Sequence, residues 1–206
     1  MAEPPVTVLL LDCDGVIRHW DVAQFEALAE SAGIDTLRLA EIAFGEELLA
    51  AAMTGAITGE VWADEIGGRA GAAHGCDALE VTAGFLRLGW TIDDAVLAIA
   101  RQVRAAGNRV AILSNATTRL EADLLSCGVT DEVDVVLSSA RMGLAKPDAA
   151  IYEAAAEALG VAPSACLFID DQSRNIDAAR EVGMHAEVFM GAAALATLAR
   201  QVGLLG

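Results

Sequence analysis

The sequence predicts an α/β protein: a doubly wound, Rossmann-like parallel sheet with an inserted helical cap domain. Five short runs rich in Val, Ile, Leu and Phe are spread along the chain, and helical stretches alternate with the later ones. Each run is continuously apolar, as expected for parallel strands that are buried on both faces. A long interval, 17–90, has helical patterns but no convincing strand, and this interval predicts the insertion.

The predicted strands follow the apolar runs in chain order. They are VTVLLLD at 6–12, RVAILSN at 109–115, VDVVLSS at 133–139, ACLFID at 165–170 and AEVFM at 186–190. Thr91-x-x-Asp94, before the second strand, has the capping-box spacing and predicts a helix start. Thr118-x-x-Glu121, after that strand, does the same. Further helices are expected at 148–160, 173–183 and 192–203. This alternation of strand and helix is typical of a doubly wound sheet.

The interval between the first and second strands is interpreted as a separate unit. Its helical patterns include DVAQFEALAESAG, GEELLAAAMTG and ITGEVWADEIGGRAG. We therefore expect residues 1–16 and 91–206 to form the Rossmann-like catalytic core, and residues 17–90 to form a helical cap.

The overall charge restricts the partners that this chain can bind. With 13 basic and 30 acidic residues the net charge is −17, which argues against nucleic acid or an anionic membrane as a partner. The N-terminus, MAEPP, has no basic flank or signal-like apolar core, and this predicts a cytoplasmic protein. An anionic substrate would have to be attracted locally, by a cation or by backbone dipoles. The oligomeric state is left open.

Polar side chains follow the predicted strands, at the edge of an open α/β sheet where ligands bind. They are Asp12 and Asp14 after the first strand, Ser114 and Asn115 at the end of the second, Lys146 after the third, and Asp170 and Asp171 after the fourth. Clustered carboxylates imply a hard divalent cation, and Mg²⁺ is the expected one. A lysine and backbone N–H groups would then hold the remaining charge of a phosphate. The inventory therefore predicts phosphoryl transfer.

Strand alternation suggests how the first two carboxylates are used. In the stretch Asp12-Cys13-Asp14, the two aspartates face one way and the cysteine faces the other. Two carboxylates on one side can divide the work of nucleophile and general acid/base. Gly15 then allows the chain to turn sharply away from the site.

These motifs resemble the haloacid dehalogenase-like superfamily, in its phosphatase branch with a helical cap. The matches are DxDGV at 12–16, Ser114-Asn115, Lys146-Pro147, and Asp170-Asp171 with Asn175, in the family's order. The LSNAT and KPDAAIYEAA stretches are most similar to sugar-phosphate phosphatases and to the phosphatase-like domains of epoxide hydrolases.

The resemblance implies a role for each matched residue. Asp12 would be the nucleophile that forms an aspartyl-phosphate, and Asp14 would protonate the leaving oxygen and then activate water. Ser114 and the Asn115 amide would bind phosphate oxygens, Lys146 would neutralise the nucleophile and the phosphate together, and Asn175 would have a polar role in the site. Mg²⁺ would bind the Asp12 carboxylate, the Asp14 carbonyl oxygen and Asp171. Asp170 would be a second ligand or an outer-shell partner.

Other residues near the first motif have two possible roles. His19 and Trp20 would line the substrate pocket or pack at the hinge of the cap. Arg18 could contact an anionic substrate, but it is expected to be a solvated side chain. Trp62 and Trp90 are expected to pack within the cap.

The favoured function is a Mg²⁺-dependent phosphohydrolase acting on a small phosphorylated metabolite. A phosphomutase, a haloacid dehalogenase of the same fold and a catalytically silent binding domain are the alternatives. A dehalogenase uses the same nucleophile without a metal and typically lacks the second aspartate of DxD, so Asp14 and the acidic pair at 170–171 count against it. A receiver-type signalling domain has its acidic pair early and its phosphoacceptor later, the reverse of the order here.

Overall fold

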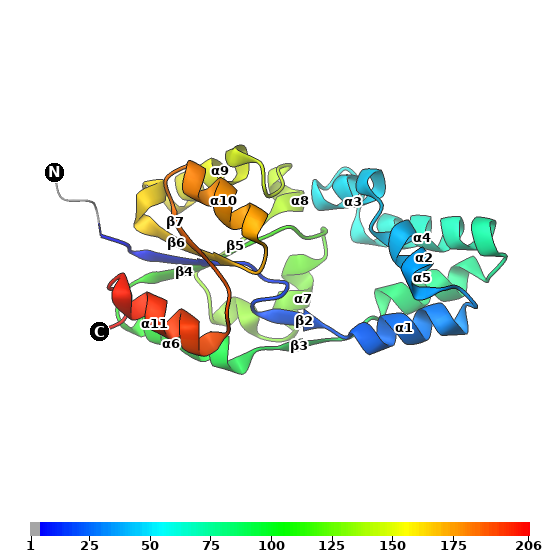
Figure 1. The fold of residues 1–206 in the computed structure, drawn as a ribbon, viewed down its shortest axis with the longest axis horizontal. Helices are drawn as coiled ribbons and strands as arrows, with labels where there is room; N and C mark the ends of the chain where they lie inside the picture. The colour runs from blue at the N-terminus through cyan, green and yellow to red at the C-terminus, as the bar shows by residue number, and fades with distance from the viewer. Residues whose placement is uncertain (1–4) are drawn as a thin grey trace.

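The computed structural model describes residues 5–206, and within them the predicted strands form one parallel sheet (Figure 1). The strands are β1 (Val8–Leu11), β4 (Arg109–Ser114), β5 (Val135–Ser138), β6 (Cys166–Asp170) and β7 (His185–Val188). Their order across the sheet is β5-β4-β1-β6-β7, and each neighbouring pair is parallel. The prediction of a doubly wound parallel sheet is confirmed, with strand ends within two residues of the apolar runs.

Helices cover both faces of this sheet (Figure 1). They are α6 (Asp94–Ala105), α7 (Leu120–Ser126) and α11 (Ala192–Gln201) on one face, and α9 (Ala149–Leu159) and α10 (Ser173–Glu181) on the other. The short elements α8 (Ser139–Met142), η1 (Val129–Asp131) and η2 (Pro163–Ala165) lie in the connections. Along β1, Leu9 and Leu11 pack into one hydrophobic cluster and Val8 and Leu10 into the other. This burial on both faces explains why the strand is continuously apolar.

Both predicted capping boxes are wrong. Helix α6 is capped by Asp93, whose carboxylate accepts hydrogen bonds from the N–H groups of Ala95 and Val96, at 2.9 and 3.1 Å. Thr118 does not cap α7; its hydroxyl instead accepts a hydrogen bond from the backbone N–H of Gly59, at 3.1 Å. At α6 the cap is Asp93, which directly precedes the helix. Near α7 the hydroxyl of Thr118 is occupied by a contact with a residue distant in sequence, Gly59.

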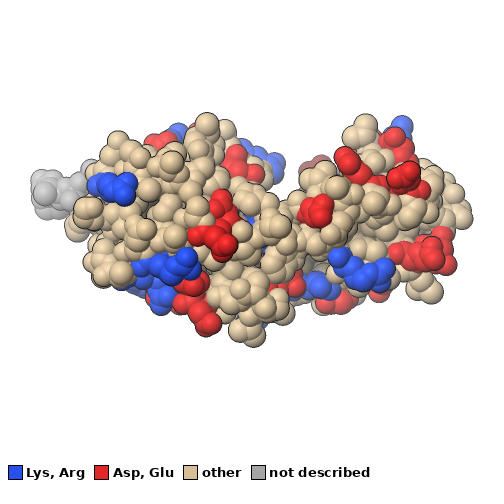
Figure 2. Space-filling view, turned by 90° about the horizontal axis from the view of Figure 1, so that it is seen from below, with Lys and Arg blue, Asp and Glu red and all other residues tan. Residues whose placement is uncertain are grey.

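The inserted interval is helical. It contains α1 (Val22–Ser31), α2 (Thr36–Ala43), α3 (Glu46–Met53), α4 (Gly59–His74) and α5 (Ala78–Leu86). These helices surround a hydrophobic cluster of their own, which includes Leu39, Ile66 and Val81. We call residues 22–86 the helical lobe. It lies at one end of the molecule, and the molecule narrows between it and the sheet (Figures 1 and 2).

A short antiparallel ribbon connects the helical lobe to the sheet. Strand β2 (Arg18–Trp20) pairs with β3 (Trp90–Ile92), so that Trp20 lies opposite Trp90. The expectation of no strand in 17–90 is therefore wrong at its two ends. A strand of three residues is too short to show the alternation of apolar and polar residues that predicts a strand. The central residues of these two strands, His19 and Thr91, are also polar, so neither strand is an apolar run.

The charged side chains are distributed over both parts of the molecule. On the face shown in Figure 2, acidic and basic side chains occur in small groups separated by uncharged surface. Within residues 5–206, no helix combines the length and the apolar character needed to cross a membrane.

Candidate active site

The loops that follow β1, β4 and β6 converge at the carboxyl edge of the sheet. Parallel strands place their carboxyl ends at the same edge, so residues far apart in sequence meet there. Asp12 follows β1, Ser114 ends β4 and Asp170 ends β6. All three are buried. The structure thus brings together the polar residues that the sequence places at strand ends.

Lys146 lies at the centre of this group. Its ammonium is 2.8 Å from the Asp12 carboxylate and 2.6 Å from the Asp170 carboxylate, and its side chain is only 1% exposed. It is also the only lysine in the sequence. Burial alone would lower the pKa of this ammonium, but the charges of Asp12 and Asp170 outweigh it and raise that pKa. The lysine is therefore held in its charged form between two carboxylates.

Backbone and amide groups fix these charged side chains in place. The N–H of Cys13 donates to Asp12 at 2.7 Å, and the N–H of Gln172 donates to Asp170 at 2.8 Å. Asn115 pairs with the backbone of Lys146: its Oδ1 accepts from the lysine N–H at 2.7 Å, and its Nδ2 donates to the lysine carbonyl at 2.8 Å. The side chain of Asn115 therefore orients the lysine loop.

Asn175 and Ser114 differ in what their side chains contact. The Nδ2 of Asn175 donates to both oxygens of Asp170 at 3.0 Å, and the residue is buried at the start of α10. This amide fixes the direction of Asp170. The Ser114 hydroxyl is fully buried and, among residues 5–206, has no hydrogen-bond partner. A buried hydroxyl without a partner is costly unless a ligand supplies one.

Asp12, Asp170 and Asp171 form a carboxylate cluster, with one oxygen of each lying within 4.8 Å of the others. Burial raises the pKa of the Asp12 carboxyl to about 7, against the opposing charge of Lys146, and Asp170 adds to the rise. Burial and the charge of Asp170 also raise the pKa of Asp171. A divalent cation with oxygen ligands would remove this mutual repulsion, so the donor set fits Mg²⁺.

Gly15 makes room for one member of the carboxylate cluster. Its φ angle is 86°, and a Cβ atom placed on it would lie 2.7 Å from Cγ of the Asp171 side chain. A residue with a side chain would both strain the backbone and displace this carboxylate. The glycine therefore turns the chain, as predicted, and also permits Asp171 to approach.

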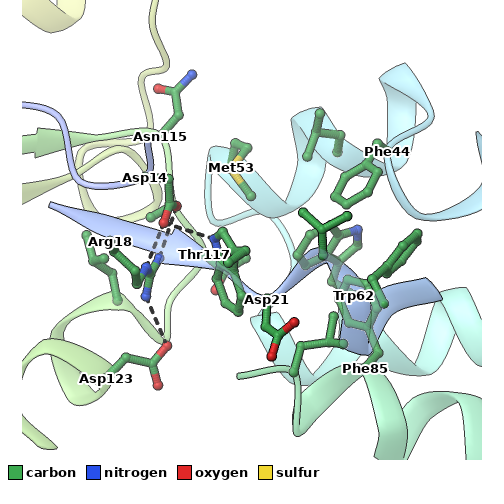
Figure 3. Close-up of a pocket in the computed structure, with 17 residues that line it drawn as sticks. Asp14, Arg18, Asp21, Phe44, Met53, Trp62, Phe85, Asn115, Thr117 and Asp123 are labelled. Carbon is green, nitrogen blue, oxygen red and sulfur yellow. Dashed lines mark hydrogen bonds and ion pairs between the residues drawn. The ribbon is translucent and has the colours of Figure 1, made fainter. Parts of the chain in front are cut away.

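Asp14 does not join the carboxylate cluster. Its carboxylate accepts hydrogen bonds from Nε and Nη2 of Arg18, at 2.6 and 3.0 Å, and from the indole N–H of Trp20, at 2.9 Å (Figure 3). The role in metal binding predicted for Asp14 involves its backbone carbonyl, which leaves the carboxylate available for these contacts. Asp14 lines a cavity, whereas Asp12 lies behind it among the buried charges.

The expectation that Arg18 is solvated is wrong. Its side chain is 3% exposed, and besides Asp14 it lies 3.5 Å from Asp123. Its guanidinium also lies over the rings of Trp20 and Trp90, at 4.7 and 5.9 Å from their centres. The sequence places Arg18 four residues after Asp14 and two before Trp20, but only the turn at 14–18 shows that these groups meet.

The remaining residues near the first motif occupy different places. Trp20 lines the cavity. His19 is not among the lining residues; it is 44% exposed, with its Nε2 at 3.9 Å from Asp93. Trp62 packs against other aromatic rings of the helical lobe, as expected, and also lines the cavity. The ring of Trp90 lies on the ribbon beside Arg18.

The sequence is similar to known hydrolases. The family profile described as haloacid dehalogenase-like hydrolase matches residues 6–183. Phosphatase MT3486 of Mycobacterium tuberculosis is 46% identical over 87 residues, which make up 41% of this chain and 40% of that protein. The chain spans about two fifths of the length of the first curated relatives that it matches.

Solved structures show a similar fold. A HAD family enzyme from Bacteroides thetaiotaomicron, in complex with magnesium and inorganic phosphate, has a TM-score of 0.71 at 22% identity and covers 89% of this chain and 93% of its own. The L-2-haloacid dehalogenase from Xanthobacter autotrophicus, with chloropropionic acid covalently bound, has a TM-score of 0.65 at 20% identity. The match covers 98% of this chain and 85% of the dehalogenase chain. At these identities the likeness concerns the fold alone.

Proposed function

Because this chain belongs to the haloacid dehalogenase-like hydrolases, we propose that it is a Mg²⁺-dependent phosphohydrolase acting on a small phosphorylated metabolite. The observation that carries the proposal is the buried ammonium of Lys146 held between Asp12 and Asp170, beside the carboxylate cluster. Such a site suits a reacting group that is itself a multiply charged anion. The similarity to a protein named as a phosphatase, and to one in complex with magnesium and phosphate, also supports it.

The carboxylates of Asp12, Asp170 and Asp171 would hold the cation, together with the Asp14 carbonyl. When bound, Mg²⁺ supplies positive charge that offsets the charge of the phosphate. Lys146 adds a fixed cation on the same side. The Ser114 hydroxyl, which has no partner among the described residues, would donate to a phosphate oxygen. This local positive charge answers the problem set by a net charge of −17.

In the first step, an oxygen of Asp12 attacks phosphorus and the bond from phosphorus to the leaving oxygen breaks. Asp14 gives its proton to that oxygen, and the product alcohol departs. Arg18 and Trp20 direct the Asp14 carboxyl to the cavity that it lines. Because the ion pair with Arg18 favours the carboxylate, Asp14 would take up this proton from solvent when the phosphoester binds. General acid catalysis of this kind contributes about 10²- to 10⁴-fold in rate.

In the second step, Asp14 takes a proton from water, and the water oxygen attacks the phosphorus of the aspartyl-phosphate. The bond between phosphorus and Asp12 breaks, which releases inorganic phosphate and restores the free carboxylate. The helical lobe would act as a cap that excludes bulk water and selects the substrate. The ribbon formed by β2 and β3 would serve as its hinge.

The test is phosphate release from p-nitrophenyl phosphate with and without Mg²⁺, for wild type, Asp12→Asn and a matched control. Asp177→Asn is that control, because the Asp177 side chain lies on α10 and is 72% exposed. We expect metal-dependent release that Asp12→Asn abolishes and Asp177→Asn leaves unchanged. Release that persists in Asp12→Asn would refute the assigned nucleophile.

A second candidate is hydrolytic dehalogenation, which the sequence similarity to an (S)-2-haloacid dehalogenase of Pseudomonas, 34% identical over 84 residues, favours. There Asp12 would attack carbon and displace halide, with no need for a metal. Halide release from short 2-haloacids, measured in a chelator, separates the two candidates. Halide release without phosphate release would overturn the phosphohydrolase. Retention of a labelled phosphoryl group on a sugar phosphate would instead indicate a phosphomutase.

A further inference from the structure

A cavity of about 470 Å³ lies between the helical lobe and the loops that follow β1 and β4. Its two sides differ in chemistry (Figure 3). The side next to the sheet presents charged and polar groups, among them Asp14, Arg18, Asn115 and Thr117. The lobe side is mostly apolar. Its lining residues are Val22, Phe25, Leu49, Met53 and the rings of Phe44, Trp62 and Phe85, together with one charged residue, Asp21, which precedes α1. The volume falls within the range of small-molecule sites.

The four aromatic rings of this wall form one continuous cluster. Trp62 meets Phe85 edge to face at 5.0 Å between ring centres, and Phe25 lies 6.5 Å from Phe85. Phe44 closes the cluster, at 6.0 Å from Phe25 and 6.1 Å from Trp62. Rings packed in this way restrain one another, so the wall is formed before any ligand arrives.

The two indole N–H groups near this wall already have partners, and so does one oxygen of Asp21. The indole N–H of Trp62 donates to the Ala43 carbonyl at 3.0 Å, and that of Trp20 donates to Asp14. Asp21, at the start of α1, accepts a hydrogen bond from the Gln24 N–H at 3.1 Å as the helix cap. A polyhydroxylated group placed against the rings would lose several hydrogen bonds to water, and among the described residues of the wall only the second carboxylate oxygen of Asp21 could replace one of them.

From this division we propose that the leaving group of the substrate is a bulky apolar group, of the size of an aromatic ring, and not a sugar. The inference rests on the proposed phosphohydrolase function and specifies its substrate class. Asp14 lines the side next to the sheet, and Asp12, two residues before it, contacts Lys146. The ester oxygen would therefore lie beside Asp14, with the phosphate towards Lys146 and the apolar group against the aromatic wall.

The test compares two phosphate monoesters of primary alcohols, so that the chemical step is similar for both. We expect kcat/KM for 2-phenylethyl phosphate to be at least tenfold higher than for glucose 6-phosphate; a tenfold ratio corresponds to about 1.4 kcal/mol. An equal value, or a preference for the sugar phosphate, overturns the inference and leaves the phosphohydrolase in place. Loss of all phosphate release, from p-nitrophenyl phosphate as well, overturns the proposed function itself.

A substitution in the aromatic wall tests whether the wall causes the preference for 2-phenylethyl phosphate over glucose 6-phosphate. Phe44 is 49% exposed, so Phe44→Ser removes a ring without opening the core, and Leu79→Ser changes an exposed apolar residue of the lobe that does not line the cavity. Phe44→Ser should lower the preference for 2-phenylethyl phosphate at least fivefold, and Leu79→Ser should leave it unchanged. If Phe44→Ser leaves the preference unchanged, the aromatic wall does not bind the leaving group and the inference is overturned.

Binding of the neutral product gives a readout that does not depend on turnover. Calorimetry with 2-phenylethanol, without metal, should detect binding to wild type and weaker binding to Phe44→Ser, whereas glycerol should not bind. Absence of 2-phenylethanol binding at millimolar concentration would overturn the inference.

Discussion

Gly15→Ala tests the geometry of the carboxylate cluster more directly than removal of a ligand does. The new methyl group would lie 2.7 Å from Cγ of Asp171 and closer still to its Oδ2, so this carboxylate must turn aside. Asp171 is an exposed residue and has room to do so. We therefore expect a loss in Mg²⁺ affinity in addition to a loss in the free energy of unfolding.

Gly183→Ala is the matched control. Gly183 has nearly the same φ angle, 89°, but apart from its chain neighbours no heavy atom of residues 5–206 lies within 4 Å of the position that its new methyl group would take. Each variant places an L-residue in a left-handed conformation, which lowers the free energy of unfolding by about 1–2 kcal/mol. Only Gly15→Ala disturbs Asp171. Because even outer-shell changes weaken metal sites about 10- to 100-fold, we expect at least a tenfold higher Kd for Mg²⁺ in that variant.

The assay is denaturant unfolding with and without Mg²⁺ at ten times the wild-type Kd. Linkage gives a stabilisation by the metal of about 1.4 kcal/mol for wild type and Gly183→Ala, and about 0.4 kcal/mol for a variant that binds tenfold more weakly. Titration calorimetry provides the Kd values independently. The reasoning fails if both variants retain the same stabilisation by Mg²⁺, because the contact with Asp171 would then have no consequence.

Three further outcomes follow from the buried polar groups. Lys146→Met leaves two buried carboxylates without their cation and should lower the free energy of unfolding in chelator by about 3–5 kcal/mol; an unchanged urea midpoint would contradict this. Arg18→Gln removes the ion pair that directs Asp14, with its two charge-assisted hydrogen bonds, and should lower kcat for p-nitrophenyl phosphate at least about tenfold with little change in KM; an unaltered kcat would show that Asp14 needs no such partner. Tyr152→Phe removes a buried hydrogen bond of 2.9 Å to the Asn175 carbonyl and should cost about 1 kcal/mol, seen as a lower Tm at an unchanged Kd for Mg²⁺.

The strands of the sheet were predictable because the property that marks them, a short continuous apolar run, can be seen within each segment of the sequence. A strand buried on both faces must be apolar at every position, so runs such as RVAILSN stand out without any knowledge of their neighbours. Parallel strands then fix the edge at which their following loops meet. For this reason the positions of Asp12, Ser114 and Asp170 relative to one another follow from the sheet alone.

The contacts of Arg18 were not predictable in the same way. A single arginine after a glycine turn is most often solvated, and nothing in its neighbours indicates burial. Its environment is formed by the turn at 14–18, by Trp90 from the far end of the insertion and by Asp123 from α7. The aromatic wall has the same origin, since its rings come from α1, α4, α5 and the end of α2 and meet only through packing of the lobe. Periodicity indicates that a ring is buried or half-buried, but not that it faces a cavity.

The distribution of charge indicates how this acidic chain would bind the proposed anionic substrate. The cations that matter are buried: Lys146 is enclosed by two carboxylates and Arg18 by two others, so neither attracts anions from a distance. Under the proposed function, discrimination would then depend on contacts made inside the site, where a phosphate would meet Lys146 and a bound cation, and where its ester group would meet the aromatic wall. A free phosphate ion would gain only the first set of contacts. An apolar phosphoester would gain both, and this difference favours release of the product phosphate after the leaving group has departed.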